Sequence, residues 1–143
     1  MKTIHKALLA LLALLLLAAG GLVIAIRTGP DRALRAAERF VAANADALAP
    51  LLDTDAPLPV YPEVVAYNSW DAAHPMDEFI LSPHLGVQYS GCYYSPDDVP
   101  LGFQNAVSVT SDGESRWSWE GDGDNHGFTV KLRDQWYFFA AWF

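Results

Sequence analysis

Residues 7–26 read ALLALLALLLLAAGGLVIAI, and this stretch decides how the rest of the chain is interpreted. It carries no charge and no side-chain hydrogen-bonding group, and as a helix it is about 30 Å long, the thickness of a bilayer's hydrocarbon core. Because a backbone in lipid must satisfy its own donors and acceptors, a helix is the expected form of a single segment. We therefore predict a transmembrane signal-anchor in domain 1–27, which binds the membrane through residues 7–26.

The flanks of this stretch bear on its processing and its orientation. Residues 18–20 (Ala-Ala-Gly) could serve as a signal-peptide cleavage site, but the apolar character continues to Ile26, which favours an uncleaved anchor. Lys2 and Lys6 favour a cytoplasmic N-terminus, whereas the arginines beyond the apolar stretch favour the opposite orientation. We predict a single-pass protein of the bacterial inner membrane with residues 28–143 in the periplasm. The bacterial assignment rests on the Ala/Leu-rich composition.

Charge is distributed unevenly along the 143 residues. The whole chain has a net charge of −8, but after residue 40 it contains three basic residues against fifteen acidic ones, a net charge of −12. Such a surface repels nucleic acid, so we exclude a DNA- or RNA-binding role and expect cations, basic protein surfaces or neutral ligands as partners. Cys92 is the only cysteine, which excludes an intrachain disulfide and a cysteine-based zinc site.

Residues 28–143 have the length of one domain. Residues 28–31 (Thr-Gly-Pro-Asp) predict a helix start, because Pro suits the first helical position and Thr with Asp imitates a capping box. Apolar residues then recur on one face until Pro50, which predicts an amphipathic helix over 30–49 that covers one face of a sheet. The proline-rich residues 50–63 are expected to form an irregular connector, and residues 64–143 the sheet.

Alternating apolar and polar residues, separated by turn sequences, predict five to seven antiparallel strands. From residue 85 to Tyr93 apolar side chains recur with period two, interrupted by Gly91, which we interpret as a bulge or a close approach of two strands. The last strand, 136–143, is apolar on both faces, so we expect it at the centre of the sheet or in an interface. The predicted fold is α+β: an N-terminal transmembrane helix, one amphipathic helix packed on an antiparallel sheet, and a C-terminal meander of the last four strands.

The alternation of apolar and polar residues predicts the register of two hairpins, because a shift by one residue moves every side chain of a strand to the other face. A three-residue loop that ends at a left-handed Gly113 pairs Val109 with Ser115 and keeps the apolar side chains on one face, whereas a two-residue turn separates them. The next hairpin is expected to pair Trp119 with Phe128 across a six-residue loop.

A candidate metal site lies at the tip of this second hairpin, where residues 122–127 read DGDNHG. Two carboxylates two residues apart and a glycine at the sixth position resemble the start of an EF-hand calcium loop. The twelfth position, a bidentate Glu in that motif, is Arg133, and the flanks are predicted strands. We therefore predict a solvated turn, with a non-EF divalent-cation site at Asp122 and Asp124, joined by Glu120, as the alternative. No other cofactor is predicted.

The sequence contains no recognisable catalytic motif. The four histidines lack zinc-ligand spacing, and no G-x-S-x-G, Walker or dinucleotide-binding pattern is present. A small cation-dependent hydrolase is the enzymatic alternative, and it requires residues 122–126 to converge on His84 or Cys92. A carbohydrate-binding module is a further alternative, because the strands are rich in aromatic residues. It requires two or three coplanar aromatics on the outer face of the sheet.

The order of elements, an apolar N-terminal helix followed by a second helix and an antiparallel sheet, is similar to that of a pilin or pseudopilin. This resemblance implies an assembly subunit. The family's processing glycine before an aromatic residue, and its nearby Glu, are missing here. The function we expect is that of a membrane-anchored, non-enzymatic domain of a bacterial cell envelope, with an interaction or structural role toward another envelope protein.

Overall fold

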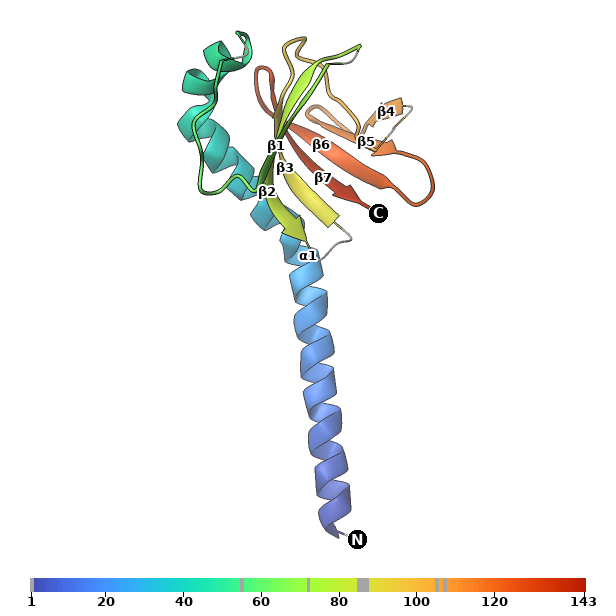
Figure 1. Cartoon of the computed structure of the whole chain (residues 1–143). Helices are drawn as coiled ribbons and strands as arrows, with labels where there is room; N and C mark the ends of the chain where they lie inside the picture. The colour runs from blue at the N-terminus through green and yellow to red at the C-terminus, as the bar shows by residue number, and fades with distance from the viewer. Residues whose placement is uncertain (1, 55, 72, 85–87, 105, 107) are drawn as a thin grey trace. The chain divides into compact units, whose positions relative to one another are not determined.

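The computed structural model describes the backbone of residues 2–54, 56–71, 73–84, 88–104, 106 and 108–143, and the side chains of these residues other than 2–10, 21–28, 83 and 84. The described residues form one helix and seven strands (Figure 1). The elements are α1 (Lys2–Leu52), β1 (Ala66–Trp70), β2 (Met76–His84), β3 (Gln88–Tyr94), β4 (Ser108–Ser111), β5 (Arg116–Glu120), β6 (His126–Arg133) and β7 (Trp136–Trp142). Two compact units divide the chain, Met1–Arg32 and Ala33–Phe143, and the second contains the whole sheet.

α1 is one assigned helix from Lys2 to Leu52, so the predicted helix start at residues 28–31 is wrong. The helix expected over 30–49 is the C-terminal part of α1. Pro30 removes one helix hydrogen bond and its ring crowds the carbonyl group four residues earlier, which normally kinks a helix interior, although its φ near −65° is itself helical. The boundary between the two units, after Arg32, lies two residues beyond this proline.

The membrane span predicted over 7–26 is only partly covered by described side chains. Each leucine from Leu11 to Leu17 is exposed, with exposed fractions between 54% and 75%. Among the residues that the structure describes, no helix is long and apolar enough to cross a membrane, and the predicted transmembrane helix is not confirmed. Residues 7–10 and 21–26 of the predicted span lie outside the described side chains.

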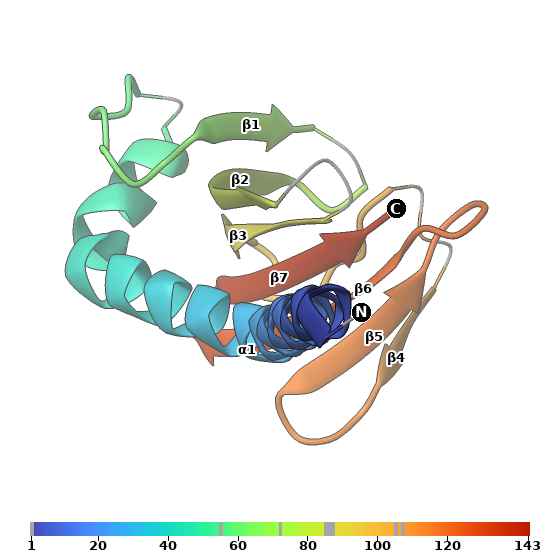
Figure 2. The same ribbon diagram turned by 90° about the horizontal axis from the view of Figure 1, so that it is seen from below.

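The sheet is antiparallel throughout, in the order β1-β2-β3-β7-β6-β5-β4 (Figure 2). β7 lies at its centre, between β3 and β6, and this confirms the position predicted from a strand that is apolar on both faces. The last four strands form the predicted meander, and the number of described strands lies within the predicted range. β1 and β4 are the two edges.

Each face of the sheet has its own core. On the helix face, α1 packs Phe40, Val41 and Leu48 against Phe79 and Phe138, as the amphipathic pattern predicted. The opposite face, here called the loop face, is covered by the segment between β3 and β4. Its core consists of Tyr93, Phe103, Trp119, Tyr137, Phe139 and Ala141.

Gly91 confirms the predicted close approach of two strands. A Cβ at this position would lie 2.0 Å from the carbonyl oxygen of Phe79 in β2, so a side chain cannot be accommodated without moving the backbone. The pairing of β2 with β3 shifts register at this point, between Ile80 and Ser82, which places a bulge beside the glycine. Residues 85–87, where the predicted strand began, lie outside the described residues.

Both predicted hairpin registers need correction. In the first hairpin Val109 pairs with Trp119 instead of Ser115, so the register is shifted by four residues. Because this shift is an even number, the apolar residues still lie on one face of the sheet, as predicted. Gly113 has the positive φ that was expected, at +149°, a value that favours glycine. Val107, which the predicted register also paired, lies outside the described residues.

In the second hairpin the register differs from the predicted one by a single residue, so the side chains of one strand lie on the opposite face from that predicted. Trp119 pairs with Gly127, not with Phe128. The reason is steric, because a Cβ at Gly127 would lie 2.3 Å from both Cζ2 of Trp119 and the carbonyl oxygen of Ala140. The indole therefore occupies the space that a side chain at residue 127 would need, and this packing sets the register. Phe128 consequently faces α1, where it packs at the margin of the helix-face core.

Candidate interaction site

Three exposed large apolar side chains of the folded unit lie at the β1 edge of the sheet. Val65, Tyr67 and Trp70 have exposed fractions of 60%, 43% and 51%. Within the described residues, no strand or helix lies along the outer side of β1 (Figure 2). An edge strand presents unpaired backbone N–H and C=O groups, which natural proteins usually protect with charged residues or proline. β1 itself, with the sequence AYNSW, contains neither.

β1 is held firmly on its inner side. Val65 N–H donates to the carbonyl oxygen of Ile80 at 2.8 Å, ahead of the regular ladder with β2. The ring of Tyr67 packs on Phe79 at 5.2 Å, and its hydroxyl donates to the carboxylate of Asp77. These contacts fix the inner side of the strand, so the outer side is presented in a defined geometry.

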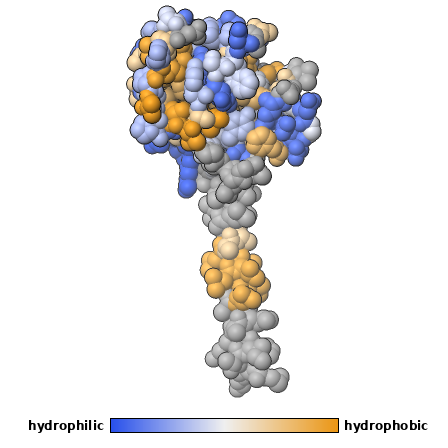
Figure 3. Space-filling model, in the orientation of Figure 1, coloured by the Kyte–Doolittle hydropathy of each residue, from blue (hydrophilic) through white to orange (hydrophobic). Residues whose placement is uncertain are grey.

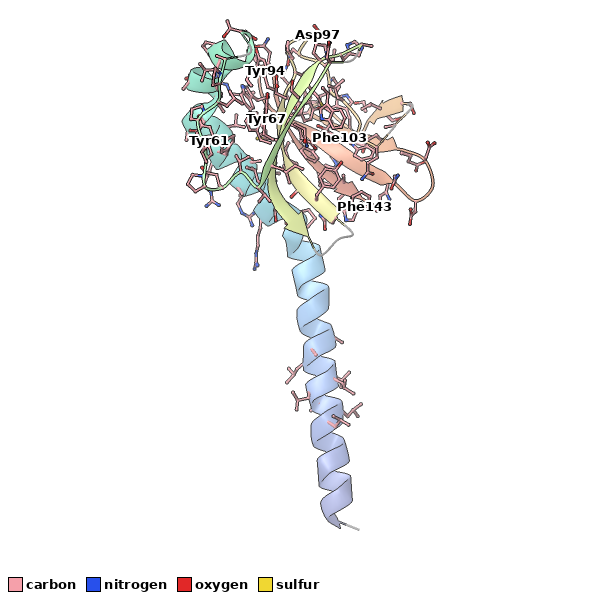
Figure 4. The ribbon with its side chains drawn as sticks, viewed as in Figure 1. Tyr61, Tyr67, Tyr94, Asp97, Phe103 and Phe143 are labelled. Atoms are coloured by element: carbon pink, nitrogen blue, oxygen red, sulfur yellow. The ribbon has the colours of Figure 1, made fainter. Side chains whose placement is uncertain are left out.

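An apolar groove of about 280 Å³ adjoins this edge, between β1 and the connector that precedes it. It is lined chiefly by Leu58, Val60, Tyr61, Val64 and Tyr67. Tyr61 anchors the connector by packing edge-on against Phe40 of α1, with ring centres 5.3 Å apart. Figure 4 labels Tyr61 and Tyr67 on these two walls, and Figure 3 shows apolar residues gathered over the connector and the start of β1.

The charges around β1 are mainly negative, although Arg39 of α1 lines the same pocket as Glu63. Residues 40–115 contain eleven acidic residues and no Lys or Arg. Glu63 and Asp71, both exposed, lie just before and just after β1, and Asp77 pairs with it from β2. This edge therefore combines an apolar groove with a field that attracts cationic groups.

Glu78 adds a buried carboxyl group to the loop face of this edge. Asn68 Nδ2 donates to its Oε2 at 2.7 Å, and the Trp70 side chain is a second hydrogen-bond donor to this carboxyl group. Burial raises the pKa of Glu78 above its ordinary value, because desolvation disfavours the charged form, and the two hydrogen bonds oppose this shift.

The candidate metal ligands lie at the turn between β5 and β6. Glu120, Asp122 and Asp124 are all exposed there, and the turn is closed by a 2.8 Å bond from Gly121 N–H to the carbonyl oxygen of Asn125. Within the described part of the chain, no three His, Cys, Asp or Glu residues are grouped closely enough to hold a metal ion. The divalent-cation site stays a prediction.

Among the described side chains, those of residues 122–126 are not brought together with Cys92, while the side chain of His84, the other residue that a hydrolase could use, lies outside the described set. Cys92 is fully buried in the helix-face core, and burial raises the pKa of its thiol, so it is not a poised nucleophile. His126 is exposed and stacks on Trp142, with ring centres 5.6 Å apart. Its Nδ1 atom lies 2.7 Å from the carbonyl oxygen of Asp124. His74 lies 3.2 Å from Asp97.

A polar network on the loop face is structural in character. Asp98 accepts a 2.6 Å bond from Lys131 Nζ and bonds from the backbone of Gln135 and the hydroxyl of Tyr137. The bond from Lys131 is the main cause of a lowered Asp98 pKa. Tyr137 stacks on Tyr93 at 5.1 Å. These bonds fasten the segment between β3 and β4 onto the sheet.

Sequence reasoning missed the residues that make the β1 edge distinctive. Most aromatic residues of the C-terminal strands are buried or half-buried, as a core requires, whereas Tyr67 and Trp70 are exposed on a strand predicted only in outline. The strand's position in the chain gave no signal, because a first strand can pair with any other strand. The edge follows from the observed strand order, in which β1 pairs with β2 alone.

Comparisons with protein-family models, with curated proteins and with solved structures found no match to this chain. No family is therefore assigned to it. The function proposed below rests on the β1 edge, the adjoining groove and the exposed leucines of residues 11–17.

Proposed function

We propose that this chain is a membrane-tethered, non-enzymatic domain of a bacterial cell envelope, and that its folded unit binds another envelope protein. The observation that carries the proposal is the apolar edge at β1, where Val65, Tyr67 and Trp70 are exposed beside the groove. Exposed apolar surface of this kind, bordered by polar residues, is typical of protein interaction sites. An edge strand left without charges is otherwise a liability for aggregation.

The tether is the N-terminal part of α1. Its sequence is uncharged from residue 7 to residue 26, and the leucines from Leu11 to Leu17 expose more than half of their surface (Figure 3). Leaving so many leucines in water is unfavourable, by about 1.5–3 kcal/mol for each full side chain. We propose that a lipid bilayer covers them, in a single-pass arrangement at the inner membrane with the folded unit in the periplasm.

Extraction of membranes at alkaline pH tests the tether. The full chain, expressed in a bacterium, is expected in the membrane pellet. The double variant Leu14→Asp/Leu16→Asp is expected to shift to the soluble fraction, because an acidic residue at the centre of a membrane helix costs about 2.5–3.5 kcal/mol. The matched control, Leu14→Ala/Leu16→Ala, keeps an apolar helix and is expected to stay in the pellet. Recovery of the unprocessed wild-type chain in the soluble fraction would overturn the proposal.

A second candidate is the pseudopilin-like assembly subunit, which the exposed leucines of residues 11–17 would also suit. In that case the exposed leucines would pack against the same segment of further copies instead of lipid alone. A Leu14→Cys variant distinguishes the two, since the native Cys92 is buried and does not compete for oxidation. Because each chain then carries one reactive thiol, oxidation yields at most a disulfide-linked dimer. A dimer band in membranes would favour the assembly subunit, and a monomeric band the tethered domain.

A further inference from the structure

We infer that the outer side of β1 binds an extended peptide segment in which apolar residues alternate with Lys or Arg, and that this segment adds to the sheet as a further strand. The inference rests on the proposed function and deepens it, because it names the partner's chemistry and the mode of binding. It follows from the backbone at the edge, the groove beside it and the charge around it.

The backbone of β1 provides the template. β1 pairs with β2 along all five of its residues, from Ala66 to Trp70, and no described element pairs with its other side. An extended chain added there forms main-chain hydrogen bonds with the edge, and the pockets beside the strand select its alternate side chains. A strand of five residues offers a ladder about 17 Å long, enough for a short linear segment.

The two faces of β1 differ in character, which explains why the proposed peptide alternates apolar with cationic residues. On the helix face, Val65 and Tyr67 border the apolar groove, so an added strand would place every second side chain against apolar surface. On the loop face, Asn68 and Trp70 both donate hydrogen bonds to the buried carboxyl group of Glu78. A long cationic side chain on that face of the added strand is suited to reach toward this carboxyl group.

Charge selects a cationic partner over a second copy of this chain. Asp71 follows β1 and Asp77 pairs with it from β2, whereas Glu63, just before the strand, shares a pocket with Arg39 of α1. Two copies paired edge to edge through β1 would bring these acidic groups together, which is unfavourable, whereas Lys or Arg residues compensate them. The opposite edge, β4, has the polar sequence SVTS and offers no comparable apolar surface.

The test uses the full chain in phosphatidylcholine nanodiscs and a synthetic ten-residue peptide of alternating Lys and Val with blocked ends. We expect saturable binding and slower amide hydrogen exchange at residues 66–70. Val65→Lys is expected to weaken binding about tenfold, which corresponds to 1.4 kcal/mol. Trp70→Lys provides a second variant at the same edge. The matched control is Thr110→Lys on β4, also exposed, which adds the same charge and is expected to change the affinity less than about twofold.

Two further peptides test the mode of binding. A Lys–Val peptide N-methylated at every residue keeps its side chains but loses the N–H donors of both edges, and it is expected not to slow exchange in β1. A Glu–Val peptide is expected not to bind. Equal binding of the methylated peptide, equal effects of Val65→Lys and Thr110→Lys, or no binding of the Lys–Val peptide would each overturn the inference.

Self-association is also a decisive outcome. If residues 66–70 are already protected in a dimer of the chain, the occupant is a second copy and the inference is wrong. These results test the peptide-binding inference separately from the proposed membrane tether. A chain that stays in the alkaline membrane pellet but does not bind the peptide contradicts only the peptide-binding inference. A chain that binds the peptide but is soluble in cells contradicts only the proposed membrane role.

Discussion

Replacement of Gly91 by valine is expected to abolish the stable folded unit. A Cβ at this position would lie 2.0 Å from the carbonyl oxygen of Phe79 and 3.0 Å from Cα of Ile80, and both are backbone atoms that cannot rotate away. Forcing β2 and β3 apart would disturb the sheet on both faces, so we expect a loss of more than about 3 kcal/mol in the free energy of unfolding. Urea unfolding followed by tryptophan fluorescence measures it.

Gly29→Ala is the control for this prediction. A Cβ at Gly29 meets no atom within 4 Å, so only the helix propensity changes, by about 1 kcal/mol in the stabilising direction. A Gly91→Val chain with the urea midpoint of the wild type would show that β2 and β3 do not approach as closely as described.

Truncation of Phe139 to alanine is expected to cost about 3–5 kcal/mol of folding stability. Phe139 is fully buried at the centre of β7 and stacks on Phe103 with ring centres 4.2 Å apart. Because Phe103 belongs to the segment that covers the loop face, the substitution leaves a cavity and loosens that segment as well. Thermal and urea unfolding of the full chain measure the loss.

Phe143→Ala provides a control of the same residue type, four residues along the chain. Phe143 is 51% exposed and stacks only on Tyr89 among the described aromatic rings, at 5.6 Å, so its truncation is expected to cost less than about 1 kcal/mol. Equal losses for the two variants would contradict the placement of Phe139 in the loop-face core.

The parts of the fold that local pattern predicted are those set by burial. A strand that is apolar on both faces, residues 136–143, has to be covered on both, and β7 is central. The periodic apolar face after Pro30 packs on the sheet for the same reason. The interruption at Gly91 marked a close approach because a glycine inside a strand leaves room for a neighbouring backbone.

Long-range packing explains the errors. The register of β5 against β6 depends on the Trp119 indole lying over Gly127, a contact that alternation of apolar residues cannot reveal. The predicted helix start at residues 28–31 was wrong because α1 is assigned on both sides of Pro30. The φ of proline is compatible with a helix, so a proline does not always mark the first residue of one.

The candidate site was the least predictable part. The spacing of Asp122 and Asp124 suggested a cation site, but the same residues are also favoured by the geometry of a turn. The β1 edge gave no motif, because its character comes from strand order, from the connector beside it and from the absence of Lys and Arg over a long stretch. These features become a site only when the sheet is assembled.

Amide hydrogen exchange of the full chain in nanodiscs, without any added peptide, tests the central claim that β1 is an open edge of a sheet built around β7. The outward amides among residues 66–70 are expected to exchange at least about a hundredfold faster than those of Phe138 and Phe139, which should exchange only on global unfolding. If all five β1 amides are as protected as those of β7, the edge is covered, and the account of how this domain binds a partner is contradicted.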